Sequence, residues 1–145
     1  MSDRAAAVNA WESLFRAQVA VMRTLAQEFP SLDISFNEYD VMFNISRQPG
    51  RQLRLRELNR HVLLTQPSVS RLVDRLVARR YLEKVNDPSD GRGAIVRLTD
   101  AGYDLYRRVA VEHADSISRR VGTMLEPAEL SELARLCDKL RGSSI

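Results

Sequence analysis

The sequence predicts a mainly α-helical protein with one small β-hairpin, and three observations support this. Apolar residues recur every three or four positions over most of the 145 residues, which is the spacing of amphipathic helices. Only residues 82–98 instead place β-branched residues on both sides of a run of turn formers. Hydrophobic residues make up 44% and charged residues 28% of the chain, an ordinary globular composition that argues against disorder.

Start and stop signals bound the first two helices. Apolar residues at helical spacing predict a helix over residues 5–29, and Pro30 ends it. Ser35 and Glu38 form a capping box, which predicts the start of a second helix. The run Gln48-Pro49-Gly50 breaks that second helix.

Two helical segments joined by a tight connection come next. Residues 56–62 predict a short helix, and Thr65 is a good N-cap for a helix that runs to about Arg80. One face of the second helix is apolar: Val69, Leu72, Val73 and Leu76. A helix, a turn and a helix with a polar and basic outer face are what reading the DNA major groove requires.

The rest of the chain predicts a hairpin and two helices. Residues 82–86 and 94–98 are expected to be strands, joined by turn formers that carry Arg92 at an exposed tip. Thr99 caps a long helix that is expected to reach about Leu125, and Pro127 lies at the start of a last helix with an apolar stripe.

Charge is unevenly distributed along the chain. Residues 47–97 contain 12 basic and 5 acidic residues, a net charge of +7, whereas the whole chain has a net charge of +3. A basic centre between acidic ends is expected when one part of a protein faces a polyanion. An arginine-rich solvated surface is the alternative, and charge alone does not decide between them.

Several classes of protein are excluded or disfavoured. The single cysteine, Cys137, excludes an internal disulfide, and two distant histidines disfavour a metal centre, so we expect no metal and no cofactor. We find no phosphate loop, nucleophile elbow or nucleophile–histidine pairing, and therefore expect no enzyme. The chain has no stretch long enough to span a membrane and no secretory h-region at its start, which predicts a cytoplasmic protein.

The order of these elements resembles the MarR family of winged helix-turn-helix transcriptional regulators. The resemblance covers nearly the whole chain, and two stretches carry it. They are Thr65-Gln66-Pro67-Ser68-Val69-Ser70-Arg71-Leu72-Val73-Asp74-Arg75-Leu76 and Asp87-Pro88-Ser89-Asp90-Gly91-Arg92, the latter followed by Val96-Arg97-Leu98-Thr99-Asp100-Ala101-Gly102.

The resemblance implies a homodimer that binds a pseudo-palindromic stretch of double-stranded DNA. It implies one domain over residues 1–145, with a winged helix-turn-helix core at about 36–98 and dimerisation helices at about 5–29 and 99–141. Such proteins are usually repressors, and they often release DNA when they bind a small aromatic or phenolic acid. One departure concerns Tyr81, where family members commonly have a glycine suited to a left-handed helix cap.

The residues expected to contact DNA lie at the start of the second helix of the pair and at the hairpin tip. They are Thr65, Gln66, Pro67, Ser68, Ser70, Arg71, Arg75 and Arg92. Glutamine can pair with adenine and arginine with guanine in the major groove. The alternative is that Gln66 and Ser68 complete a helix cap and Arg71 is a solvated charge.

The hairpin tip combines a cation with a carboxylate. Arg92 on a two-stranded projection can enter a narrow minor groove, where the potential is most negative. Asp90 should repel phosphate, so we expect it to support the hairpin by holding an arginine in place. An ordinary exposed turn is the alternative.

Four aromatic residues of the first two helices are candidates for a ligand site: Trp11, Phe15, Tyr39 and Phe43. They are expected on inward faces of their helices, and a plain core role is the alternative. The function expected overall is a sequence-specific, ligand-responsive repressor. The alternative is a winged-helix module that binds protein and shows no sequence preference for DNA.

Overall fold

The computed structural model describes residues 2–30, 33–62 and 66–142, which form two compact units. The central unit is Pro30–Val111, and the terminal unit combines Met1–Phe29 with Glu112–Ile145. The division falls inside helix α5 (Asp100–Ile117), which contributes to both units. The expectation of one domain over residues 1–145, with a core at 36–98, stays a prediction.

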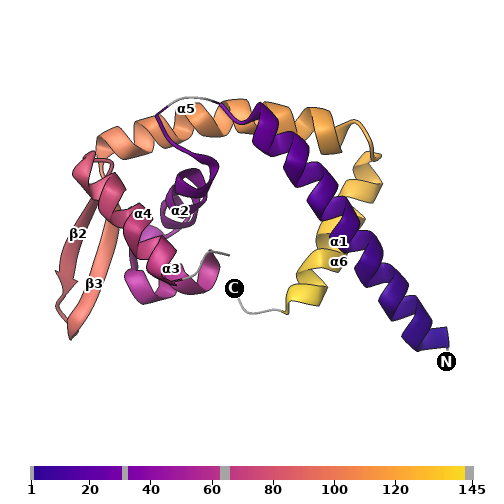
Figure 1. Cartoon of the computed structure of the whole chain (residues 1–145), viewed down its shortest axis with the longest axis horizontal. Helices are drawn as coiled ribbons and strands as arrows, with labels where there is room; N and C mark the ends of the chain where they lie inside the picture. The colour runs from indigo at the N-terminus through magenta and orange to yellow at the C-terminus, as the bar shows by residue number, and fades with distance from the viewer. Residues whose placement is uncertain (1, 31–32, 63–65, 143–145) are drawn as a thin grey trace. The chain divides into compact units, whose positions relative to one another are not determined.

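The central unit begins with three helices that carry most of the predicted signals. Helix α2 (Phe36–Ser46) starts at the Ser35–Glu38 capping box, in which the Ser35 Oγ accepts from the Glu38 N–H at 3.2 Å. A 3-10 turn (Pro49–Arg51) follows it, and then helices α3 (Leu55–His61) and α4 (Gln66–Ala78). Figure 1 shows these three helices beside the hairpin. The predicted helices are confirmed, while the predicted cap at Thr65 lies outside the described residues.

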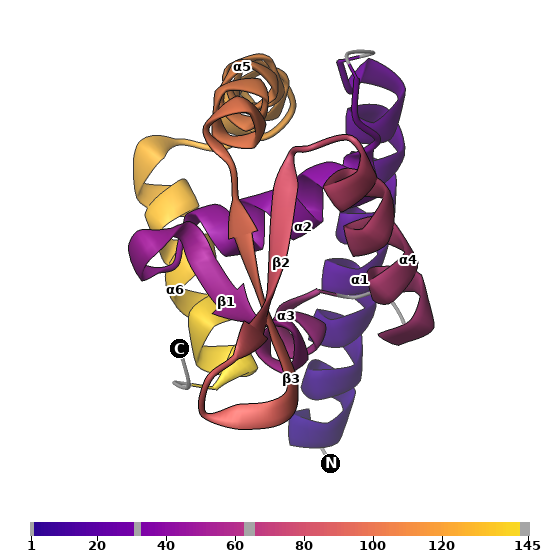
Figure 2. The ribbon, with the colours of Figure 1, turned by 90° about the vertical axis from the view of Figure 1, so that its left-hand side faces the viewer.

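A three-stranded antiparallel sheet completes the central unit. Strands β2 (Leu82–Asp87) and β3 (Asp90–Leu98) form the predicted hairpin. Strand β1 (Gln52–Arg54), which the sequence did not predict, pairs with the other edge of β3, so that the strand order is β1-β3-β2. Figure 2 shows β3 between its two neighbours.

Most of the apolar core lies within the central unit. Its fully buried side chains come from α2, α3, α4, the sheet and the first part of α5, and they include Met42, Ile45, Leu58, Val69, Val73, Leu76, Leu82, Val96, Leu105 and Val109. The predicted apolar face of α4 is therefore confirmed as the face that packs inward. Because that face is buried, the opposite face of α4 is left at the surface.

The terminal unit contains α1 (Ser2–Glu28), the end of α5, a π-helical turn (Ser118–Gly122) and α6 (Pro127–Arg141). The long predicted helix therefore changes to π-helical winding at Ser118 and does not continue as a regular α-helix to Leu125. Glu28 at the end of α1 accepts hydrogen bonds from Ser116 and Arg120. The predicted apolar stripe of α6 is exposed at Leu133 and Leu140, and Cys137 is half-buried.

Candidate nucleic-acid interface

The outer face of α4 presents arginines and serines. Arg71 and Arg75 are exposed, while Ser68 and Ser70 are half-buried in the first turns of the helix. Thr65 lies outside the described residues, and for Gln66 and Pro67 only their place in the first turn of α4 is described. The structure thus brings the described members of the predicted α4 set onto one surface.

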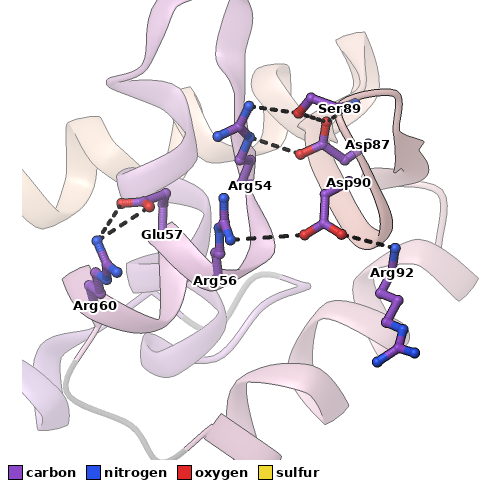
Figure 3. A network of polar contacts seen from close by, with 8 residues as sticks. All are labelled: Arg54, Arg56, Glu57, Arg60, Asp87, Ser89, Asp90 and Arg92. Atoms are coloured by element: carbon purple, nitrogen blue, oxygen red, sulfur yellow. Dashed lines mark hydrogen bonds and ion pairs between the residues drawn. The ribbon is translucent and has the colours of Figure 1, made fainter.

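The hairpin tip, residues 87–92, consists of the turn at 88–89 and the strand ends on both sides of it, because β3 begins at Asp90 and not at the predicted residue 94. Arg92 lies in this tip, and its side chain extends away from the polar network around it (Figure 3). The Arg92 backbone N–H donates to Asp90 Oδ1 at 3.1 Å, and Arg56 Nη1 lies 3.9 Å from Asp90 Oδ2. Asp90 therefore holds the backbone of Arg92, and its nearest guanidinium is that of Arg56. The Arg92 guanidinium is left exposed at the tip.

A second network joins the turn of the tip to β1, and sequence reasoning missed it (Figure 3). Arg54 Nε is 2.8 Å from Asp87 Oδ2, and Arg54 Nη2 donates to Ser89 Oγ at 3.0 Å. The Ser89 N–H and Oγ both donate to Asp87 Oδ1, at 2.9 and 2.7 Å. These hydrogen bonds, with the charge of Arg54 beside them, hold the pKa of Asp87 below its ordinary value.

Most of the cations in the basic window 47–97 already have partners. Six of the twelve form ion pairs with carboxylates: Arg54, Arg56, Arg60, Arg79, Lys84 and Arg97. Two more lie over aromatic rings: Arg47 over Phe43 and Arg51 over Tyr103. Within residues 2–30, 33–62 and 66–142, the other four have neither kind of partner: Arg71, Arg75, Arg80 and Arg92. Three of these four belong to the predicted site.

The end of α4 differs from the expectation at Tyr81. Arg80, one residue earlier, takes the left-handed conformation with φ at 66°, and Tyr81 is not strained. The Tyr81 N–H donates to the Leu76 carbonyl at 2.9 Å and the Arg80 N–H donates to the Val77 carbonyl at 3.0 Å, which together form a Schellman motif. The Thr99 hydroxyl also donates to the Arg80 carbonyl, so the start of α5 is tied to the end of α4.

The four predicted ligand residues form two separate pairs. Trp11 and Phe15 contact each other on α1, and they are 59% and 51% exposed, so the expectation that they face inward is wrong for the single chain. Val8, one helical turn before Trp11, is exposed as well. Tyr39 and Phe43 are half-buried on α2, and Tyr39 stacks on Tyr106 of α5 with ring centroids 5.4 Å apart. Burial raises the pKa of Tyr39 above its ordinary value.

No metal site or membrane span is found in the part of the chain that the structure describes. Across residues 2–30, 33–62 and 66–142, no three histidine, cysteine, aspartate or glutamate side chains are grouped closely enough to hold a metal ion. Over the same ranges, every helix is too short or too polar to cross a membrane.

A helix-turn-helix flanked by a three-stranded sheet with a projecting hairpin defines a winged helix-turn-helix protein. Residues 32–93 match the family model described as the MarR family. The uncharacterized HTH-type transcriptional regulator YhbI of Bacillus subtilis (strain 168) is 25% identical over 128 residues, which cover 88% of this chain and 79% of YhbI. The winged helix-turn-helix of this chain therefore matches that of the MarR family of transcriptional regulators.

Two solved structures of transcriptional regulators, both from Streptomyces coelicolor, are similar over most of their length. Sco3205, solved in complex with DNA, is 26% identical with a TM-score of 0.79, over 91% of this chain and 84% of that one. The PcaV transcriptional regulator, solved in complex with its natural ligand, is 28% identical with a TM-score of 0.72, over 88% and 89% of the two chains.

Proposed function

We propose that this protein binds double-stranded DNA with sequence specificity through α4 and the hairpin tip, and that it acts as a repressor. One observation carries the proposal: Arg71, Arg75 and Arg92 have no ion-pair or aromatic partner among the described residues, whereas most neighbouring cations do. Exposed cations that no carboxylate neutralises can contact DNA phosphates and base edges. The DNA complex of Sco3205 supports the same assignment by similarity.

The two elements have different parts in this proposal. Arg71 and the polar residues Gln66, Ser68 and Ser70 would read base edges in the major groove, because they lie in the first turns of α4. Arg75 would contact the phosphate backbone. Arg92 would enter the adjacent minor groove, where a narrow groove concentrates negative potential.

We propose a homodimer as the DNA-binding form. The terminal unit exposes large apolar side chains that a single chain leaves uncovered, among them Trp11, Phe15, Leu133, Leu136 and Leu140. Monomeric proteins rarely expose large contiguous apolar patches, so these helices are suited to a second copy of the chain. Two subunits would place two α4 helices in successive major grooves of a pseudo-palindrome.

A small aromatic or phenolic acid is the proposed effector. The stacked rings of Tyr39, Phe43 and Tyr106 offer a planar apolar surface on α2 and α5, and Arg47 lies over the end ring, that of Phe43. The complex of PcaV with its natural ligand supports a ligand-responsive role by similarity. Trp11 and Phe15 stay predicted ligand residues, although their exposure also suits the dimer contact.

Selection of bound duplexes from a random pool tests the proposal. The selected duplex, titrated by fluorescence anisotropy against a random duplex of equal length, should bind at least about 1000-fold more tightly. Repetition with a panel of aromatic acids tests the effector. Equal, weak binding to both duplexes would favour the alternative, a winged-helix module that binds an acidic protein.

A further inference from the structure

We propose that Arg54 is not a DNA contact and that Arg54 and Asp87 are positioning residues, which together hold the hairpin tip where Arg92 can reach DNA. The inference rests on the proposed function, and it concerns a basic residue that charge alone would assign to the DNA surface. Arg54 and Asp87 are 33 positions apart in the sequence and lie on different strands, β1 and β2.

The pair spans the width of the sheet. Since the strand order is β1-β3-β2, the Arg54 side chain must pass over β3 to reach Asp87. Gly93 lies against the Asp90 carboxylate and the Asp87 side chain, because a Cβ there would be 3.1 Å from Asp90 Oδ2 and 3.4 Å from Asp87 Cβ. The absence of a side chain at Gly93 therefore leaves room for the polar network above β3.

The Asp87 carboxylate is buried and bonds to the turn residue Ser89. Its side chain is only 4% exposed, while that of Arg54 is 45% exposed. The strand register is shifted between Asn86 and Asp87, and this is where the hairpin leaves regular pairing. At this irregular point the Asp87 carboxylate accepts two hydrogen bonds from Ser89, so Arg54 connects the turn itself to β1.

A second link leads from the turn to Arg92. Asp90 pairs across the turn with Asp87 in the strand register and accepts the Arg92 backbone N–H. Arg56, two residues beyond Arg54, faces the same Asp90 from the start of α3. Arg54 at the end of β1 thus pairs with Asp87 of the tip, and Arg56 at the start of α3 pairs with Asp90. These two ion pairs connect the tip to the first helix of the helix-turn-helix.

The positioning role and a DNA-contact role predict opposite effects of Asp87→Asn. If Arg54 contacted DNA, removal of the Asp87 charge would free a cation and strengthen binding. If the pair positions the tip, Asp87→Asn weakens binding by roughly tenfold, within the range for residues that act through a network. Arg54→Gln should weaken binding by a similar factor, and the double variant should bind no more weakly than either single variant.

Salt dependence provides an independent measurement. Arg54 is already neutralised by Asp87, and in Arg54→Gln the Arg92 contact still forms once the tip is ordered on DNA, so this variant should bind more weakly with an unchanged slope of log K against log[salt]. Arg92→Gln, in contrast, should reduce the slope by about 2 in a dimer that loses one contact per subunit. Arg135→Gln is the matched control, because it removes an arginine–carboxylate pair on α6 and should change neither affinity nor slope.

Hydrogen exchange on the DNA-free protein separates this inference from the proposed function. Arg54→Gln, or Arg54→Lys if the first variant does not fold, should speed exchange of the Ser89 and Arg92 amides at least about tenfold and leave core amides unchanged. Unchanged exchange, or tighter binding by Asp87→Asn to the selected duplex, would overturn the positioning role. Failure of the unsubstituted protein to prefer the selected duplex would overturn the proposed function alone.

Discussion

Gly102 in the first turn of α5 lies directly against the backbone of Tyr81, so that a Cβ on Gly102 would overlap the Tyr81 carbonyl oxygen. The Thr99 N–H donates to that same carbonyl at 3.2 Å, and the Thr99 hydroxyl accepts the Gly102 N–H at 3.0 Å. The end of α4 and the start of α5 therefore meet through backbone atoms, which cannot move aside as a flexible side chain can.

Gly102→Ala should destabilise the protein by about 3 kcal/mol, because the added methyl group must displace backbone. In an ordinary helix the same change would stabilise, by roughly 0.5–1 kcal/mol. Urea unfolding followed by circular dichroism measures the difference. Gly91→Ala is the control, since a Cβ there meets nothing within 4 Å and should leave stability within about 0.5 kcal/mol. Stabilisation by Gly102→Ala would contradict the close approach.

Arg80→Gly should stabilise the protein by about 0.5–1 kcal/mol. Arg80 takes a left-handed conformation that glycine adopts without steric cost, and its side chain has no ion-pair partner among the described residues. Tyr81→Gly should destabilise instead, because Tyr81 donates its hydroxyl to Asp33 and its ring lies beneath Arg79. Thermal melts of both variants test the assignment, and a lower midpoint for Arg80→Gly would contradict it.

Glu28 should make the protein lose stability in acid. Two hydrogen bonds from Arg120 and one from Ser116 lower the pKa of Glu28 from 4.5 to about 2. A carboxylate whose folded-state pKa is lowered contributes stability that is fully present above its unfolded pKa and is lost as the pH falls. The contribution should therefore be complete above about pH 5 and disappear towards pH 2.

Glu28→Gln isolates this effect. The variant should be less stable than the unsubstituted protein at pH 7, and the two should converge near pH 2, as measured by urea midpoints across the pH range. If the two curves of urea midpoint against pH keep a constant separation down to pH 2, the hydrogen bonds from Arg120 and Ser116 do not lower the pKa of Glu28.

Arg92→Ala should weaken operator binding and change the thermal midpoint by no more than about 2 °C, because the exposed side chain contributes little to folding. If a dimer neutralises roughly eight phosphates, log K should fall against log[salt] with a slope near −7. Anisotropy titrations at several salt concentrations measure both quantities. Unchanged affinity would remove the hairpin tip from DNA binding.

Phe15→Asp should convert a dimer to a monomer at micromolar concentration, because it places a charge within the exposed apolar face of α1. Sedimentation of the unsubstituted protein should give twice the mass of one chain. Val85→Asp is the control, since it makes the same kind of change at a residue of β2 that is 38% exposed in the central unit. A monomeric unsubstituted protein would contradict the proposed dimer.

Local signals in the sequence determined most of the fold, because caps, breakers and apolar periodicity act within a few residues. The capping box at Ser35, the Thr99 cap and the apolar face of α4 are such signals, and the structure confirms each one. The same local pattern placed Arg71, Arg75 and Arg92 on the outer surface.

Only the tertiary structure decided which charges are neutralised and which surfaces are covered. The pair of Arg54 and Asp87 depends on the strand β1, whose three residues are too few to show a period of their own, and on a register that connects distant segments. The exposure of Trp11 likewise follows from what packs on α1 and not from its helical spacing. Periodicity indicates which face of a helix is apolar, but the element that covers that face comes from elsewhere in the chain or from another molecule.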